Sequence, residues 1–427
     1  MKVFLLAAIV FGAVAPVRAQ VAPEAISPRK LDLGISGTLT YSAFYSQMAD
    51  LYNGTSGQMA YLSGNFGYST TSQSHPTSIL FGAGDGWGVS GTGVDSGLYE
   101  NLSLSQGFAG KRLSLQLADA VGYFRGTPVT GFTGQPGTGQ SISQPSGSVT
   151  ETVFAVNTNM VSNSSTANAS YKLTARTALS GGGGYYLFLF PNGGGLDTKT
   201  ATVHGSLNHV VDPRDSLFGQ YAFFQFTYSG TGFTVDTHST SGGWQRTWSR
   251  HITTSVSAGP QWTVIEANTP EPVSTNLAIN ALLAGAYKAG NVNLNYSRGI
   301  EGGGGYFYGA EMDDFTGSFA RQFGHRVGSQ FTMEFAGGYM RTSALKSLSS
   351  VNIPGVGSVQ QGSFNSWYGS TQETRHLGRY LSVYANYTAT DQTASSNVPA
   401  SSNLLTSLWQ VVSFGVGFTP QPIHLRH

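Results

Sequence analysis

The strongest constraint in this sequence is an alternation of apolar and polar residues with a period of two, which recurs along nearly the whole chain after its first residues. Phe331, Met333 and Phe335 are apolar, for example, and the intervening Thr332 and Glu334 are polar. Successive side chains of a β-strand point to opposite faces, so this pattern predicts strands with one apolar and one polar face. Helical spacing is nowhere sustained beyond the N-terminal segment, and the fold class is therefore all-β.

The composition indicates where such strands would be stable. Charged residues make up 10% of the chain, whereas about 25% is typical of soluble domains. The mean hydropathy is −0.10, and no later segment approaches the roughly 18 apolar residues of a membrane helix. A transmembrane β-barrel reconciles these facts because it places apolar residues outward and polar residues inward. The absence of cysteine excludes a disulfide framework, and a net charge of +1 gives no case for nucleic acid.

The N-terminal residues have the features of an export signal. Lys2 supplies a positive start, an apolar run follows from Val3 to Val14, and Val17 to Ala19 end in a small residue. We therefore expect residues 1–19 to be a cleavable signal peptide. Residues 20–30 would then form a short periplasmic segment before the barrel.

The connections between the predicted strands are of two kinds. Seven are short and basic: Lys111-Arg112, 172–176, 210–215, 249–251, 288–291, 324–326 and 375–379. The longer ones are rich in Gly, Ser, Thr, Asn and Pro: 125–163, 191–198, 266–273, 299–313, 343–362 and 390–403. Short periplasmic turns at one end and long extracellular loops at the other are typical of outer-membrane barrels.

The alternation predicts a single antiparallel transmembrane β-barrel of about 18 strands, with 16 as the alternative. The expected strands are 31–45, 58–69, 78–89, 98–109, 112–124, 150–172, 176–189, 198–209, 216–228, 234–248, 252–265, 274–288, 291–299, 312–323, 327–340, 363–374, 380–389 and 404–418. The third strand is weakly defined, and the sixth could start later. An even number of strands returns the C-terminus to the side on which the first strand began.

The distribution of charge supports this arrangement independently. Most Lys and Arg residues lie at or beside the short turns, and most Asp and Glu residues lie in or beside the long loops. Charge is expensive on a lipid-facing wall, so a barrel moves its charged residues to the two rims. A soluble protein has no reason to sort its charges by loop length.

The last predicted strand carries a family resemblance. The run from Ser413 to Phe418 is similar to the C-terminal assembly signal of Gram-negative outer-membrane β-barrels, which ends in an aromatic residue. The resemblance implies that Phe414 and Phe418 take part in insertion by the barrel-assembly machinery. The chain departs from the pattern because residues 419–427 follow the aromatic. We assign 31–418 to the barrel and 419–427 to a periplasmic tail, and the resemblance identifies no specific porin family.

Two acidic residues fall within the predicted walls. Glu334 is placed inward by its alternation, whereas Asp119 shares the register of Leu117 and would face lipid. A bulge near Ala118 would turn Asp119 into the lumen, and we expect such a bulge. The resulting lumen candidates are Asp119, Glu334, Gln330, Asn293, Asn295 and Asn386.

Enzyme, cofactor and metal sites are not indicated. The glycine runs 181–184 and 302–305 lack the Lys-Ser/Thr of a phosphate loop. The first fits a curved strand covered by aromatic neighbours, and the second fits a loop. The histidines are scattered without metal-ligand spacing, and no serine stands out as a nucleophile. We therefore assign no catalytic, metal or cofactor-binding residue.

The leading interpretation is a porin-like outer-membrane channel for passive passage of small polar solutes. A ring of carboxylates at the extracellular mouth, at Glu311, Asp313 and Asp314, would make it weakly cation-selective. The alternatives are a polysaccharide export barrel and a non-conducting adhesion or structural barrel that acts through its loops. The expected partners are outer-membrane lipid, the assembly machinery and small polar solutes. The sequence leaves open whether the chain forms a homo-oligomer.

Overall fold

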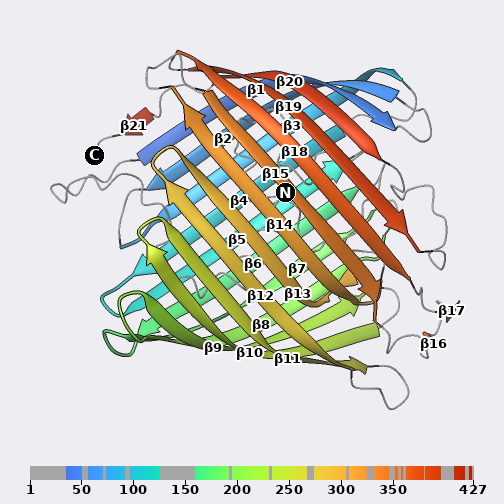
Figure 1. Ribbon diagram of the computed structural model, residues 1–427. Helices are drawn as coiled ribbons and strands as arrows, with labels where there is room; N and C mark the ends of the chain where they lie inside the picture. The colour runs from blue at the N-terminus through green and yellow to red at the C-terminus, as the bar shows by residue number, and fades with distance from the viewer. Residues whose placement is uncertain are drawn as a thin grey trace.

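The computed structural model describes residues 35–50, 56–70, 74–91, 97–125, 159–191, 195–229, 233–266, 274–303, 307–324, 331–345, 352–353, 357–358, 362–378, 380–395, 408–418 and 423–425. Eighteen long antiparallel strands form one barrel with strongly tilted strands (Figure 1). β1 pairs with β2 on one side and with β20 on the other, and this last pairing closes the barrel. The predicted signal peptide lies outside the described residues.

The wall strands alternate in direction around the barrel. Their bounds are β1 Ile35–Asp50, β2 Ser56–Thr70, β3 Thr77–Gly91, β4 Gly97–Ala109, β5 Leu113–Arg125, β6 Met160–Lys172, β7 Thr177–Leu189, β8 Thr198–Val210, β9 Asp215–Tyr228, β10 Phe233–Ser249, β11 Ile252–Glu266, β12 Ser274–Tyr287, β13 Gly290–Glu301, β14 Ala310–Phe323, β15 Phe331–Ala344, β18 Ser363–Leu377, β19 Leu381–Ala394 and β20 Trp409–Phe418. A small hairpin, β16 Asn352–Ile353 with β17 Gly357–Ser358, lies between β15 and β18.

The described residues form eighteen barrel strands, in agreement with the prediction of about 18, and most strand bounds agree within a few residues. The sixth strand starts at Met160 rather than at 150, and the last at Trp409 rather than at 404. The two ends of the barrel differ as expected. We call the end with the connection 110–112 the short-turn end, and the end with the connections 302–309 and 345–362 the long-loop end.

The short turns are closed by side chains that accept backbone N–H groups. The Asp212 carboxylate accepts the N–H groups of Arg214 and Asp215, at 2.7 and 2.8 Å, and these bonds lower the pKa of the carboxyl. Thr174 Oγ1 accepts the N–H groups of Arg176 and Thr177 in the same way. Such Asx and Ser/Thr turns fix a tight reversal between two strands.

The two faces of the wall differ in chemistry as the alternation predicts. Large apolar side chains on the outer face are exposed, for example Leu117 at 55%, Val203 at 58% and Phe414 at 59%. The inner face is rich in buried hydroxyl and amide side chains, such as Thr202 and Gln392. Among the described residues, no helix is long and apolar enough to cross a membrane.

The glycine run 181–184 lies within β7, as predicted, and one of its members is covered by an aromatic ring. A Cβ on Gly184 would lie 2.2 Å from the hydroxyl oxygen of Tyr186. Tyr186 is buried on the inner face, and its ring occupies the space over Gly184. The glycine is therefore needed for the close approach of the ring.

The C-terminal residues pair with the first strand, β1. Phe414 and Phe418 both lie on the exposed outer face of β20, where Phe418 pairs with Tyr41. Further on, the three-residue strand β21, Ile423–Leu425, pairs with the start of β1, with Leu425 opposite Ile35. Part of the expected tail therefore extends the pairing of β1 beyond the barrel strand β20.

Candidate functional site

The candidate site is the inner wall, and Glu334 lies in a polar row that crosses it. The pairing runs from Glu334 on β15 to Gln372 on β18, then to Asn386 on β19 and Ser413 on β20. All four side chains are buried on the inner face. Gln372 Nε2 donates to Thr374 Oγ1 at 3.2 Å, and Thr388 Oγ1 donates to Asn386 Oδ1 at 3.1 Å. The row thus combines two of the predicted lumen residues near the short-turn end.

Two further lumen candidates lie on β13. Leu294 is exposed on the outer face, so its neighbours Asn293 and Asn295 point inward. Asn293 pairs with Ser318 and Asn295 with Thr316 on β14, so the wall here is uncharged and polar. Gln330 lies outside the described residues. A role for any of these residues in binding solute stays a prediction.

The predicted bulge beside Asp119 is wrong. The pairing of β5 with β4 and with β6 continues without a shift through Leu117, Ala118 and Asp119. Asp119 therefore shares the outer face with Leu117. Its carboxylate accepts hydrogen bonds from Ser165 Oγ at 2.6 Å and from Asn163 Nδ2 at 3.4 Å. Donors from the neighbouring strand satisfy this carboxylate on the outer face, and no change of register is needed.

The expected acidic mouth is also only partly present. β14 starts at Ala310, two residues before the expected strand 312–323, so Glu311 belongs to the same strand as Asp313 and Asp314. Alternation then places Glu311 and Asp313 outward, where the Arg298 guanidinium forms ion pairs with both, at 3.3 Å to Asp313. Tyr296 also donates its hydroxyl to Asp313 at 3.0 Å. Only Asp314 points inward, and the assignment of Glu311 and Asp313 to the pore mouth needs correction.

A carboxylate that the sequence did not single out accompanies Asp314. Glu301 ends β13 on the inner face, and Asp314 lies on the inner face of the paired strand β14. In the pairing, Asp314 lies opposite Ser297, four residues before Glu301 on the same face of β13. Buried Met312, Met340 and Tyr368 pack together beside Asp314. Two carboxylates thus line the wall at the long-loop end.

The Asp, Glu, Lys and Arg residues of the inner wall are of one kind. Away from the short-turn rim, the charged inner-face side chains that the structure describes are Glu301, Asp314 and Glu334. No Lys or Arg joins them on the described inner face between the rims. The side chains of β1 are not described, but the sequences of β1, β2 and β20 contain no Lys or Arg. A cation in this lumen would meet carboxylates with no basic competitor on the described wall.

An aromatic cluster lies inside the barrel at the long-loop end. The connection between β13 and β14 runs inward, and its described residues 302–303 and 307–309 are buried. Tyr228 on β9 donates its hydroxyl to the Gly302 carbonyl at 3.0 Å. Tyr308 meets the rings of Tyr228 and Phe233 edge-on, with centroids 5.0 and 5.5 Å apart. Burial raises the pKa of the Tyr308 phenol above its ordinary value.

The same connection also contacts the opposite part of the wall. Phe307 packs on Phe364 of β18, with ring centroids 5.5 Å apart. β9 and β18 lie on either side of β13, separated from it by β10–β12 and by β14–β15. The connection therefore reaches from one part of the wall to another across the inside of the barrel. We call residues 302–309 the inward loop.

Two glycines allow the inward loop to bend. Gly303 and Gly309 have φ angles of 80° and 84°, in the left-handed region that favours glycine. A Cβ at Gly303 would lie 2.9 Å from Phe307 Cβ, and one at Gly309 would lie 2.8 Å from Leu345 Cδ1. The glycine run 302–305 was expected to be loop, and its described residues are. The sequence contains one signal that could have indicated an inward path. Three consecutive aromatics, Tyr306-Phe307-Tyr308, are unusual in a solvated loop.

Comparisons with known proteins give no family for the chain. No family model matches the sequence, and no curated protein matches it.

Among the described residues, no group of three or more His, Asp or Glu side chains is placed to hold a metal.

Solved structures overlap with the barrel only loosely. OccK2 (OpdF) of Pseudomonas aeruginosa shares 9% identity over 91% of this chain and 98% of its own, with a TM-score of 0.44. The outer membrane protein opdK of the same organism shares 9% identity over 90% of this chain and 98% of its own, with a TM-score of 0.42. The structure of OccK2 (OpdF) in complex with glucuronate shares 10% identity over 92% of this chain and 96% of its own, with a TM-score of 0.43. The conclusions below therefore rest on the barrel's own geometry.

Proposed function

We propose that this protein is an outer-membrane channel for passive passage of small polar solutes, with a weak preference for cations. The observation that carries the proposal is the sorting of one closed barrel into an apolar outer face and a polar inner face. Such a wall is stable in a bilayer, and barrels of 16 to 18 strands are wide enough for an aqueous path. Small polar solutes and lipid are the partners that these two faces would contact.

The inner carboxylates support the preference for cations. Glu301 and Asp314 lie on the wall at the long-loop end, and Glu334 lies near the short-turn end. Side chains of one sign along a narrow path raise the local concentration of the opposite ion. The preference should fade above about 0.1 M salt, where the Debye length falls below about 10 Å. This proposal moves the source of selectivity from the outward Glu311 and Asp313 to the inner wall.

The basic short turns would face the periplasm and the long loops the outside. Lys and Arg at a membrane rim can bind anionic headgroups, so they need not oppose the carboxylates inside. Insertion would use the last strand, whose Phe414 and Phe418 are exposed on the outer face. Phe418→Ala should then reduce accumulation in the outer membrane more than Phe335→Ala, which alters an equally exposed aromatic on β15, outside the last strand.

The test is the reversal potential of the purified full chain in a planar bilayer under a salt gradient. We expect discrete conductance steps and a reversal potential of the sign that cation preference gives. Anion preference would contradict the selectivity. Absence of conductance in a correctly folded barrel would contradict the channel and favour an adhesion or structural role through the loops.

A further inference from the structure

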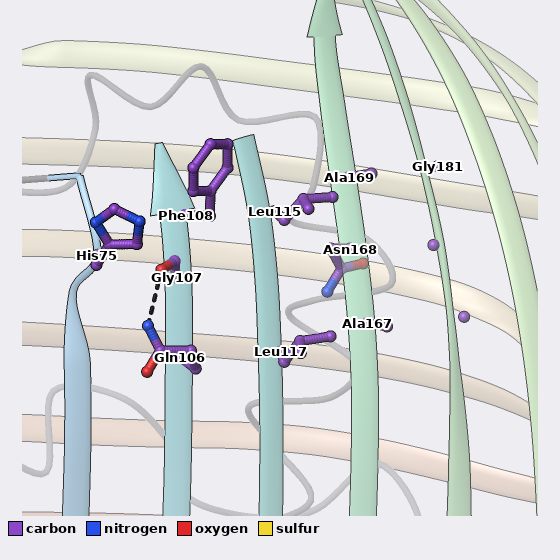
Figure 2. A pocket seen from close by; sticks show the side chains of 12 residues that line it. His75, Gln106, Gly107, Phe108, Leu115, Leu117, Ala167, Asn168, Ala169 and Gly181 are labelled. Carbon is purple, nitrogen blue, oxygen red and sulfur yellow. Dashed lines mark hydrogen bonds between the residues drawn. The ribbon is translucent and has the colours of Figure 1, made fainter. Parts of the chain in front are cut away.

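The outer face of the wall has a groove that the proposed channel does not use (Figure 2). It has a volume of about 500 Å³ and crosses strands β4–β7, beside the connection before β3. Phe108, Leu115 and Leu117 form one side, and the residues on the next two strands are small. The small residues are Ala167, Ala169, Gly181 and Gly183.

The register shows that these residues share the outer face. Leu115 pairs with Ala169 and Leu117 with Ala167, and the same two alanines pair with Gly181 and Gly183 on β7. Leu115 and Leu117 are both exposed, at 42% and 55%. Paired residues of antiparallel strands project to the same face. The groove is therefore a depression in the apolar surface.

Charge differs between the two ends of this groove. At the short-turn end, the turns beside it carry Lys111, Arg112 and Arg176, all exposed, and the Lys172 N–H donates to the Arg112 carbonyl at 2.9 Å. At the other end, two residues beyond Leu117, lies the outward carboxylate of Asp119. An anionic group is attracted to the first end and repelled from the second.

The depth from the basic turn to Leu117 is close to half of a bilayer. Leu117 lies five positions after Arg112, about 17 Å along the strand, which at a strand tilt of about 40° is about 13 Å along the membrane normal. Half of the hydrocarbon core of a bilayer is about 15 Å. A lipid with its headgroup at the basic turns would place an acyl chain along Phe108, Leu115 and Leu117.

We propose that this groove is a binding site for one anionic phospholipid of the leaflet next to the short turns. The phosphate contacts Lys111 and Arg112, and an acyl chain fills the space over the small residues. The site depends on insertion of the barrel in a membrane and does not depend on conductance. A second copy of the chain is the other occupant that the experiment must separate.

Native mass spectrometry of the full chain in detergent tests the proposal, with phosphatidylglycerol and phosphatidylcholine of identical acyl chains as probes. We expect the first lipid adduct to form at least about fivefold more tightly with phosphatidylglycerol, because two basic residues lie at the headgroup. The double variant Lys111→Gln/Arg112→Gln should lose this preference. The matched control Arg214→Gln/Arg250→Gln removes charge from two other short turns and should keep it.

A second pair of variants tests the groove itself. Ala167→Leu/Ala169→Leu fills the depression from two outward positions and should weaken the binding of both lipids severalfold. Ala281→Leu, on the outer face of β12, is the control and should change neither. Circular dichroism checks that each variant is folded. Equal affinity for the two lipids, or unchanged binding in either test variant, would overturn the proposal. Dimers that disappear when the groove is filled would overturn it in favour of a second copy.

Discussion

The two ends of the lumen are built differently, although the same strands form both. At the long-loop end, the inward loop packs aromatic rings against β9, β10 and β18, and Glu301 and Asp314 lie on the inner faces of β13 and β14. At the short-turn end, Glu334 lies in a row of amides and hydroxyls with no aromatic cluster among the described residues of that row. For the proposed channel, this difference predicts that passage is limited at the long-loop end and that the short-turn end is a polar vestibule.

The first prediction removes the constriction. Replacing residues 303–308 by a short Gly-Ser linker should raise the single-channel conductance by roughly a factor of two or more, since the narrowest part of a pore limits conduction. The matched change is removal of the hairpin 352–358, whose strands β16 and β17 pair only with each other. If both deletions gave the same conductance as the original chain, the proposed asymmetry between the two ends would be wrong.

The second prediction compares the carboxylates of the two ends. Glu301→Gln/Asp314→Asn should shift the reversal potential toward zero by more than Glu334→Gln does, because a fixed charge acts most strongly where the path is narrow. Glu311→Gln/Asp313→Asn serves as the control, since both residues lie outward beside Arg298. A larger shift in the control than in the inner pair would place the selectivity at the mouth.

The sequence predicts features that depend on local alternation, and it does not predict those that depend on contacts between distant strands. Alternation specified the strands, and it placed Asn295 and Glu334 on the inner face because their neighbours are clearly apolar. It also places Asp119 outward, and the bulge is not needed because donors on the neighbouring strand satisfy the carboxylate on the outer face. Asn163 and Ser165 satisfy it from a strand more than 40 residues away, and no local pattern shows such a pairing.

The acidic mouth was mispredicted for a related reason. The sequence marks the boundary between loop and strand only to within a few residues, and a run of three carboxylates at that boundary does not show by itself which of them point into the pore. The neighbouring Asp314 differs from Asp313 only by the alternation of β14. The inward path of the loop depends on contacts with β9 and β18, which are distant in the chain.

The third prediction concerns the bend of the inward loop. Gly309→Ala should lower the free energy of unfolding by about 1–2 kcal/mol, because an L-residue is strained at a φ of 84°. Gly369→Ala in β18, where a Cβ would meet nothing within 4 Å, should have little effect or stabilise slightly. Urea unfolding in lipid vesicles measures both. Equal changes in the free energy of unfolding at the two positions would show that the inward loop does not keep its bend in the membrane.

The fourth and smallest prediction removes one anchor of the loop. Tyr228→Phe deletes the hydroxyl that bonds the Gly302 carbonyl and leaves the ring contacts with Phe233 and Tyr308. We expect a loss of about 1 kcal/mol of stability and more frequent conductance fluctuations, because the loop is held less firmly. Tyr339→Phe, which removes a hydroxyl bonded to Asn365 near the outer surface, should leave the current steady.

The most direct test of a water-filled lumen uses the absence of native cysteine. Asn295→Cys and Leu294→Cys place a thiol on the inner and outer face of β13, at adjacent positions. A positively charged, membrane-impermeant thiol reagent should label Asn295→Cys in a bilayer and reduce its current, and it should leave the current of Leu294→Cys unchanged. Labelling of Leu294→Cys alone, or of neither position in a folded barrel, would contradict an aqueous path along the inner wall.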